Sequence, residues 1–194
     1  MARGFPPQTT RPSSSSRWAA ALLGLDQWVK AWTVSAFAAP AEGMVATAAP
    51  ARSFLPGLVE LTRVHNFGAA WSSFSGMRWL LLIVTVAIVA AVAVVLVRRI
   101  VRHPLGVCAC WLILSGGLGN IIDRARLGYV VDMFHFEFWP SYPVFNVADI
   151  CVVAGAILGA IYYMWLYEKY DQKKPAPEIP PVETDDGTCD APTE

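Results

Sequence analysis

The stretch WLLLIVTVAIVAAVAVVLV, residues 79–97, contains no charged side chain. A helix needs about 20 consecutive apolar residues to cross the hydrocarbon core of a bilayer, which is ~30 Å thick. A helix packed in a water-soluble core would be interrupted by polar residues on its outer side, and this stretch has no such pattern. The stretch therefore predicts a membrane-spanning helix, and with it an integral membrane protein.

Three further apolar segments lie near residues 18–38, 105–122 and 146–167. The whole chain of 194 residues is 55% hydrophobic and only 15% charged, which is typical of membrane proteins. We therefore expect an α-helical membrane protein with four transmembrane helices. The formal net charge of zero gives no indication of nucleic-acid binding.

The first apolar segment could also be a secretory signal peptide, because SAFAAP (35–40) resembles a cleavage site. Asp26 and Lys30, however, lie where the apolar centre of a signal peptide should run. We therefore expect the segment to be retained as the first helix.

Both ends of the chain are predicted to be disordered tails. Residues 1–17 are basic and rich in Pro and Ser, whereas 168–194 are rich in Pro and acidic residues. Segment 18–167 is the predicted membrane domain. Lys and Arg are more numerous at the two tails and near 98–102 than in the other loops, so both termini are expected in the cytoplasm.

With this topology, segments 39–78 and 123–145 are extracytoplasmic. Residues 54–75 mix β-branched and polar side chains and are punctuated by Gly57 and Gly68. This pattern predicts short strands at the membrane surface.

The cysteines and histidines give no sign of a metal or redox site. Cys108, Cys110, Cys151 and Cys189 have neither metal-ligand spacing nor a disulfide framework, so we expect them to pack as small apolar residues. Motifs such as GxSxG, HExxH or a phosphate-binding loop are absent from the sequence. We predict neither a metal nor a cofactor.

Ionisable residues within membrane segments are costly and are therefore candidates for function. Asp26 and Lys30 are spaced i, i+4, which suits an ion pair. They could simply neutralise each other or could position another group. Asp123 precedes Arg124, and a neighbouring guanidinium favours the charged carboxylate, so a structural salt bridge is the favoured interpretation.

Asp132 and Asp149 differ, because both are flanked by apolar residues and no Lys or Arg lies close to them in sequence. Asn146 and Asp149 should project from one face of the first turn of the last helix. Two carboxylates brought together share one proton, which is the chemistry of aspartic proteases. The alternative is two unrelated acids at the membrane interface.

Two other classes of function remain open at this point. A small transporter or proton relay also carries intramembrane acids, although these would be spread over the depth of the membrane. A purely structural membrane subunit would explain an ion pair but not two unpaired acids.

Five stretches together resemble one family, the lipoprotein signal peptidases, also called prolipoprotein signal peptidases or signal peptidase II. In chain order they are DQWVK (26–30), HNFGAAWS (65–72), GGLGNIIDR (116–124), GYVVDMF (128–134) and FNVADICV (145–152). The resemblance covers residues 18–167.

The resemblance implies four transmembrane helices, a small extracytoplasmic β-sheet that cradles substrate, and an extracytoplasmic loop or helix. It implies an aspartic endopeptidase of the bacterial inner membrane, active near the outer face. Such an enzyme removes signal peptides from prolipoproteins, cutting before a diacylglyceryl-modified cysteine, and is inhibited by the cyclic peptide globomycin. A monomer is expected, because one chain carries the whole site.

The resemblance also assigns roles to residues. Asp132 and Asp149 match the catalytic pair. The residues that match supporting or substrate-binding positions are Asp26, Lys30, Asn66, Gly68, Ala70, Asn120, Asp123, Arg124 and Asn146. The departures are a long Ala/Pro-rich linker at 39–57 and Trp71 where phenylalanine is more usual.

Overall fold

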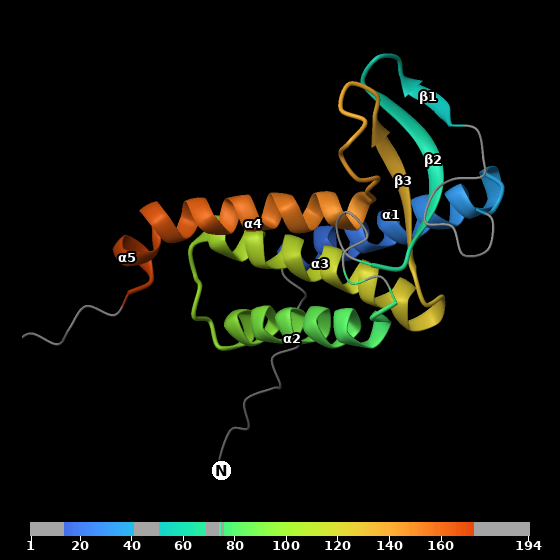
Figure 1. Cartoon of the computed structure of the whole chain (residues 1–194). Coiled ribbons are helices and arrows are strands. Elements are labelled where there is room, and N and C mark those ends of the chain that lie inside the picture. Colours follow the sequence, from blue (N-terminus) through green and yellow to red (C-terminus); the bar gives the residue numbers. More distant parts are fainter. Residues whose placement is uncertain (1–13, 41–50, 69–73, 75, 173–194) are drawn as a thin grey trace, which may run out of the picture.

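A computed structural model describes residues 14–40, 51–68, 74 and 76–172. Long helices run side by side, with α1 behind α3 and α4, and a small β-sheet stands at one end of them (Figure 1). The elements in chain order are α1 (Ser14–Ala36), β1 (Arg52–Leu55), β2 (Val59–Asn66), α2 (Arg78–Val97), α3 (Pro104–Arg126), β3 (Val130–Phe136), α4 (Val147–Trp165) and α5 (Tyr167–Tyr170).

Three helices, α2, α3 and α4, are long and apolar enough to cross a membrane by length and composition. The helix α1 has 23 residues but is not among them. It begins with three serines and Arg17 and also carries Asp26 and Lys30, which lower its hydropathy. Three of the four predicted spans are therefore supported, and the span predicted at 18–38 is not.

The helix α3 lies at the centre of the helices and packs against α1, α2 and α4. Close approach depends on its glycines, because a Cβ on Gly116 would collide with the carbonyl oxygen of Ala148. A Cβ on Gly119 would lie 2.5 Å from the carboxylate of Asp26. The small residues of SGGLGN thus permit helix contacts that larger side chains would prevent.

The sheet has the order β1-β2-β3, and both pairs are antiparallel. The strands expected within 54–75 are present as β2 and the end of β1. The strand β3 was not predicted, although its Val, Phe and His residues are typical of a strand. It pairs with β2, with Val64 opposite Asp132, and its first four residues are buried.

The described residues extend beyond the limits expected for the two tails. Residues 14–17 belong to α1, and the chain is described to Gln172 through α5. The rest of both tails and the linker residues 41–50 lie outside the described residues. Residues 137–146, which connect β3 to α4, contain turns and no helix.

Candidate active site

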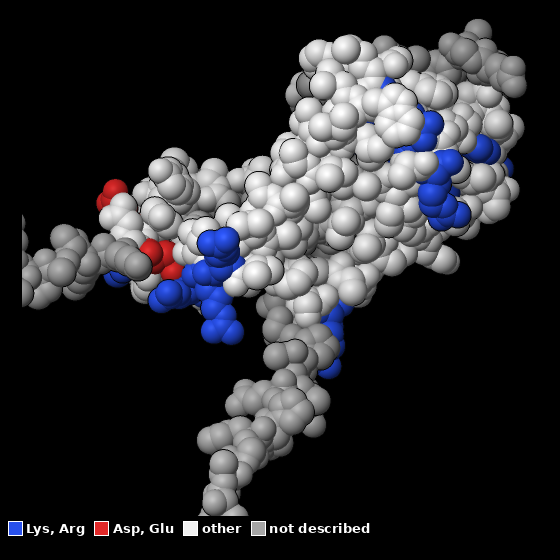
Figure 2. All heavy atoms as spheres, turned by 90° about the horizontal axis from the view of Figure 1, so that it is seen from below, with Lys and Arg blue, Asp and Glu red and all other residues white. Residues whose placement is uncertain are grey.

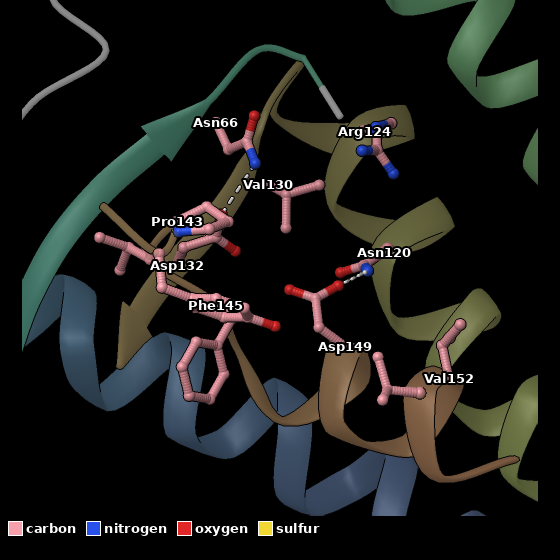
Figure 3. A pocket seen from close by; sticks show the side chains of 12 residues that line it. Asn66, Asn120, Arg124, Val130, Asp132, Pro143, Phe145, Asp149 and Val152 are labelled. Atoms are coloured by element: carbon pink, nitrogen blue, oxygen red, sulfur yellow. Dashed lines mark hydrogen bonds between the residues drawn. The ribbon is translucent and has the colours of Figure 1, made fainter. Parts of the chain in front are cut away.

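Asp132 lies on β3 and Asp149 lies in the first turn of α4, and both line one cavity of about 280 Å³. Figure 3 shows the two carboxylates directed into the same space from these two elements. The rest of the wall includes the apolar residues Val130, Phe145 and Val152. The structure therefore brings together the two acids that the sequence singled out.

Asp132 is held by two side-chain amides. Asn66 donates from Nδ2 to Oδ2 at 2.9 Å, and Asn146 donates from Nδ2 to Oδ1 at 2.6 Å. The side chain is almost fully buried, and no ion pair joins it to a described Lys or Arg. Burial, together with the nearby carboxylate of Asp149, raises the pKa of Asp132 to about 8.

Asp149 is the third residue of α4 and forms a capping box with Asn146, the N-cap residue. The Asn146 side chain accepts from the Asp149 backbone N–H at 2.9 Å, and Asp149 Oδ2 accepts from the Asn146 N–H at 3.2 Å. Asn120 donates from Nδ2 to Asp149 Oδ1 at 2.8 Å. Asn146 and Asp149 are thus three residues apart because together they cap the N-terminus of α4.

Asn146 joins the two halves of the site. Its Nδ2 group donates to Asp132 and, at 3.2 Å, to Asn120 Oδ1, while its Oδ1 accepts from the backbone of Asp149. The residue is completely buried. Both acids are therefore fixed through one asparagine, which makes their separation a property of the fold rather than of mobile side chains.

Behind the acids lies a buried ion cluster. Lys30 Nζ lies 2.9 Å from Asp26 Oδ2 and 3.0 Å from Asp123 Oδ2, and it donates to Asn120 Oδ1 at 3.1 Å. The predicted pair of Asp26 and Lys30 is present. The prediction for Asp123 was wrong in its partner, because Asp123 pairs with Lys30 of α1 and not with its sequence neighbour Arg124.

The acids of this cluster also bind backbone next to the cavity. Asp26 Oδ1 accepts the N–H of Ala148 at 2.9 Å, and Asp123 Oδ2 accepts the N–H of Val131 at 3.2 Å. Ala148 and Val131 each immediately precede one of the two cavity acids in sequence. The cluster therefore does more than neutralise charge, because it fixes the backbone that carries the acids.

Arg124 lines the cavity and donates from its Nη2 to the carbonyl oxygen of Gly68 at 3.0 Å. The N–H of Gly68 in turn donates to Asn66 Oδ1 at 2.9 Å, so that the chain after β2 is tied to the site. Ala70, predicted to belong to the same motif, lies outside the described residues.

Sequence reasoning did not single out Gln27. Its Nε2 group lies 3.1 Å from Asp26 Oδ2, 3.2 Å from Asp123 Oδ1 and 3.3 Å from the Gly119 carbonyl oxygen. A glutamine between Asp26 and Lys30 in an apolar helix was the signal available in the sequence. In the part of the chain that is described, no group of His, Cys, Asp and Glu could hold a metal ion, and Cys108, Cys110 and Cys151 are free thiols.

Comparisons with known proteins agree on one family. Residues 18–165 match the family described as signal peptidase (SPase) II. A lipoprotein signal peptidase of Enterococcus faecalis is 36% identical over 143 residues, which are 74% of this chain and 83% of that protein. One of Streptococcus thermophilus is 38% identical over 148 residues, which are 76% of this chain and 90% of that protein.

The fold agrees as well. A bacterial membrane enzyme solved by the in meso method at 2.3 Å resolution superposes with a TM-score of 0.69 at 25% identity, covering 84% of this chain and 93% of that one. A second bacterial membrane enzyme, solved by the same method at 1.9 Å, gives a TM-score of 0.64 at 27% identity, covering 78% and 92%.

Proposed function

Because the chain belongs to the signal peptidase II family, whose members remove signal peptides from prolipoproteins, we propose that it is an aspartic endopeptidase with Asp132 and Asp149 as its catalytic pair. The observation that carries this proposal is the shared cavity. Two carboxylates line it, that of Asp132 buried and that of Asp149 half-buried, each hydrogen-bonded to an asparagine amide and neither ion-paired with a described Lys or Arg.

The protonation of the pair suits acid–base catalysis. With a pKa of about 8, Asp132 is protonated at neutral pH. Because two neighbouring carboxylates share one proton, we assign the negative charge to Asp149. Asp149 lies at the N-terminus of α4, where the helix dipole favours a negative charge. Asp132 is therefore the general acid, and Asp149 is the general base.

In the first step, Asp149 takes a proton from a water molecule, and the resulting hydroxide attacks the carbonyl carbon of the scissile peptide bond. Asp132 donates its proton to the carbonyl oxygen, which yields a neutral tetrahedral intermediate. In the second step, Asp149 gives its proton to the amide nitrogen, the C–N bond breaks, and Asp132 recovers a proton from the hydroxyl. The pair then returns to its starting state.

The substrate is a prolipoprotein whose cysteine after the cleavage site carries a diacylglyceryl group. The cavity wall supports an apolar substrate, since Val130, Phe145 and Val152 face the same space as the acids. Asn66, the last residue of β2, and Gly68 just after it are the proposed cradle for the substrate backbone, which their hydrogen bond to each other supports.

In the membrane, α1 is the fourth span, both termini are cytoplasmic, and the site lies near the outer face of the bacterial inner membrane. Burial and pairing of Asp26 and Lys30 support this placement of α1, because a paired charge is less costly at membrane depth than an isolated one. One chain contains both acids, which supports a monomer.

A proton relay is less well supported. Asp26, Asp123, Asp132 and Asp149 are joined by hydrogen bonds into one group around Asn146 and Lys30. A relay across the bilayer would need acids spread over its depth.

The test is cleavage of a diacylglyceryl-modified prolipoprotein by the purified full-length chain. Asp132→Asn and Asp149→Asn should each lower the rate by about 10²–10⁴-fold, as expected for loss of a general acid or base. Glu168→Gln is the matched control, because Glu168 is exposed and belongs to α5. Full activity of either Asn variant would exclude the pair.

Two further arms test the substrate and the inhibitor. The same prolipoprotein without the diacylglyceryl group should not be cleaved. Globomycin should abolish cleavage by the wild-type chain and by Glu168→Gln alike. Equal cleavage of both substrate forms would contradict the proposed specificity while leaving the catalytic pair intact.

A further inference from the structure

A second cavity lies where α2 ends and α3 begins, at the end of α3 opposite to Asp123. Its volume is about 610 Å³. The residues that line it are Leu96, Arg99, Val101, Arg102, Val107 and Trp111. The cavity thus combines two guanidinium groups with an apolar wall, and it shares no residue with the site of Asp132 and Asp149.

Three arginines lie where α2 ends and α3 begins. Arg98, Arg99 and Arg102 are exposed, and within the described ranges no acidic side chain forms an ion pair with them. Seen from below, Lys and Arg lie at both ends of the molecule, and at the end that carries α5 they stand near acidic side chains (Figure 2). Arg98, Arg99 and Arg102 therefore present positive charge at the boundary of the apolar helices.

Asp171 is close to this group but is used for another purpose. Its Oδ1 accepts the backbone N–H of Arg102 at 3.1 Å, and its Oδ2 accepts the N–H of His103 at 3.2 Å. It also accepts from the hydroxyl of Tyr162. Asp171 thus fixes the backbone of the loop, and its charge also acts on Arg102 without forming an ion pair with it.

The loop itself is held in an unusual conformation. Arg99 has a φ of +51°, a left-handed conformation that is costly for a residue with a large side chain. Its carbonyl oxygen accepts from Arg102 Nε at 3.3 Å, which ties the Arg102 side chain to the backbone of Arg99. Both arginines line the cavity, and a guanidinium group offers several N–H donors to an anion.

The remaining wall is suited to a hydrocarbon chain. Leu96 comes from the last turn of α2, and Val107 and Trp111 come from the first two turns of α3. The helix α2 has no buried residue and packs mainly on α3, so its other faces are left to the lipid.

We propose that this cavity binds one anionic phospholipid, with its phosphate between Arg99 and Arg102 and an acyl chain along Leu96, Val107 and Trp111. Basic pockets between transmembrane helices have this preference for anionic head groups. A bound lipid would bridge α2 and α3 and would stabilise the contact between them. The proposal is independent of the cleavage reaction.

Native mass spectrometry of the full-length chain in detergent tests this site. Phosphatidylglycerol should bind at one molecule per chain, and phosphatidylcholine with the same acyl chains should bind at least tenfold more weakly. The Arg99→Gln/Arg102→Gln variant should bind phosphatidylglycerol about thirtyfold more weakly, since each arginine near an anionic surface contributes about 1 kcal/mol. The Arg98→Gln/Arg126→Gln variant removes the same charge outside the cavity and should bind like the wild type.

Three outcomes would overturn the proposal. The first is equal binding of the two lipids to the wild-type chain, which requires no variant and so does not depend on how variants fold. The second is an equal loss of binding in both double variants, which would indicate unspecific attraction. The third is displacement of phosphatidylglycerol by inorganic phosphate at equal concentration, which would indicate a site for phosphate alone.

Discussion

The carboxylate of Asp123 accepts a hydrogen bond from the backbone N–H of Val131, the residue that precedes Asp132. On the other side of the site, Asp26 accepts from Ala148, the residue that precedes Asp149. Lys30 pairs with both of these supporting acids. One lysine thus holds together the two acids that orient β3 and α4, and the separation of the proposed catalytic pair depends on an ion cluster behind it.

The first prediction concerns this cluster. Asp123→Asn leaves Lys30 with one acidic partner and weakens the acceptor for Val131. Breaking a buried ion pair typically costs about 3–5 kcal/mol, so the variant should unfold at clearly lower temperature. Thermal unfolding, together with cleavage assays made below the unfolding range, separates the two effects.

We expect Asp123→Asn to unfold at a lower temperature than the wild type. Below its unfolding range it should retain part of its cleavage activity. Glu168→Gln, which changes an exposed acid, should leave both quantities unchanged. Wild-type thermal stability combined with complete loss of cleavage would instead make Asp123 a catalytic residue.

The second prediction concerns the stability of Asp132→Asn as a function of pH. The pKa of Asp132 is about 8 in the folded protein, whereas an aspartate in an unfolded chain has a pKa of about 3.9. Between these two values the folded state binds more protons, so the Asp132 contribution to stability falls as pH rises. An asparagine does not titrate, and its contribution is independent of pH.

The expected result is that Asp132→Asn gains stability relative to the wild type between about pH 4 and pH 8, by a few kcal/mol in total. The measured quantity is the slope of this stability difference against pH. Asn has only one acceptor oxygen for the two amides of Asn66 and Asn146, which lowers the stability of the variant by the same amount at every pH. Thermal unfolding at pH 5 and pH 8 measures it. A difference that stays constant over this range would contradict the raised pKa of Asp132.

Several parts of this arrangement could be predicted from sequence and others could not. The uncharged run 79–97 fixes one span through hydropathy alone, and Asp26 and Lys30 show their pairing through helical spacing. The partner of Asp123 was mispredicted, because sequence proximity favoured Arg124 whereas the packing of α1 on α3 brings Lys30 closer.

The strand β3 was missed for a related reason. Its residues read as part of an apolar interfacial stretch, and only pairing with β2 makes them a strand. The contact of Asp132 with Asn66 follows from that pairing, which joins residues far apart in the chain. The apolar residues around the two acids suggested the dyad. Its geometry depends on Asn146, and the hydrogen bonds by which Asn146 contacts both acids become visible only in the folded structure.

The third prediction follows from that bridge. The hydrogen bond from Asn146 lowers the pKa of Asp132, so Asn146→Ala should raise that pKa further. If Asp132 is the acid, cleavage falls as pH rises through its pKa, and this descending limb should move to higher pH in the variant. The rate at the optimum should also fall, because α4 loses its N-cap.

A pH–rate profile of the wild type and Asn146→Ala over pH 5–10 tests this. The N-cap loss alone costs about 1 kcal/mol of stability and would lower the amplitude without moving the limb. Asn146→Ser retains a cap but lacks the amide donor, and it should show the shifted limb with better stability. An unshifted limb in both variants would assign the acid role to another group.

The fourth prediction concerns Gly119, whose lack of a side chain makes room for the ion cluster. A Cβ at this position would lie 2.5 Å from Asp26 Oδ2 and 3.2 Å from the Cβ of Ala148. Gly119→Ala should therefore displace Asp26 from both Lys30 and the start of α4, with loss of cleavage and a lower unfolding temperature.

Gly159→Ala is the matched control in the neighbouring helix, since a Cβ there meets only the Cβ of Ala109 at 3.8 Å. Alanine is favoured over glycine in a helix by about 1 kcal/mol, so the control should be as stable as the wild type or more so. Equal behaviour of the two variants would mean that the position of Asp26 does not govern the site.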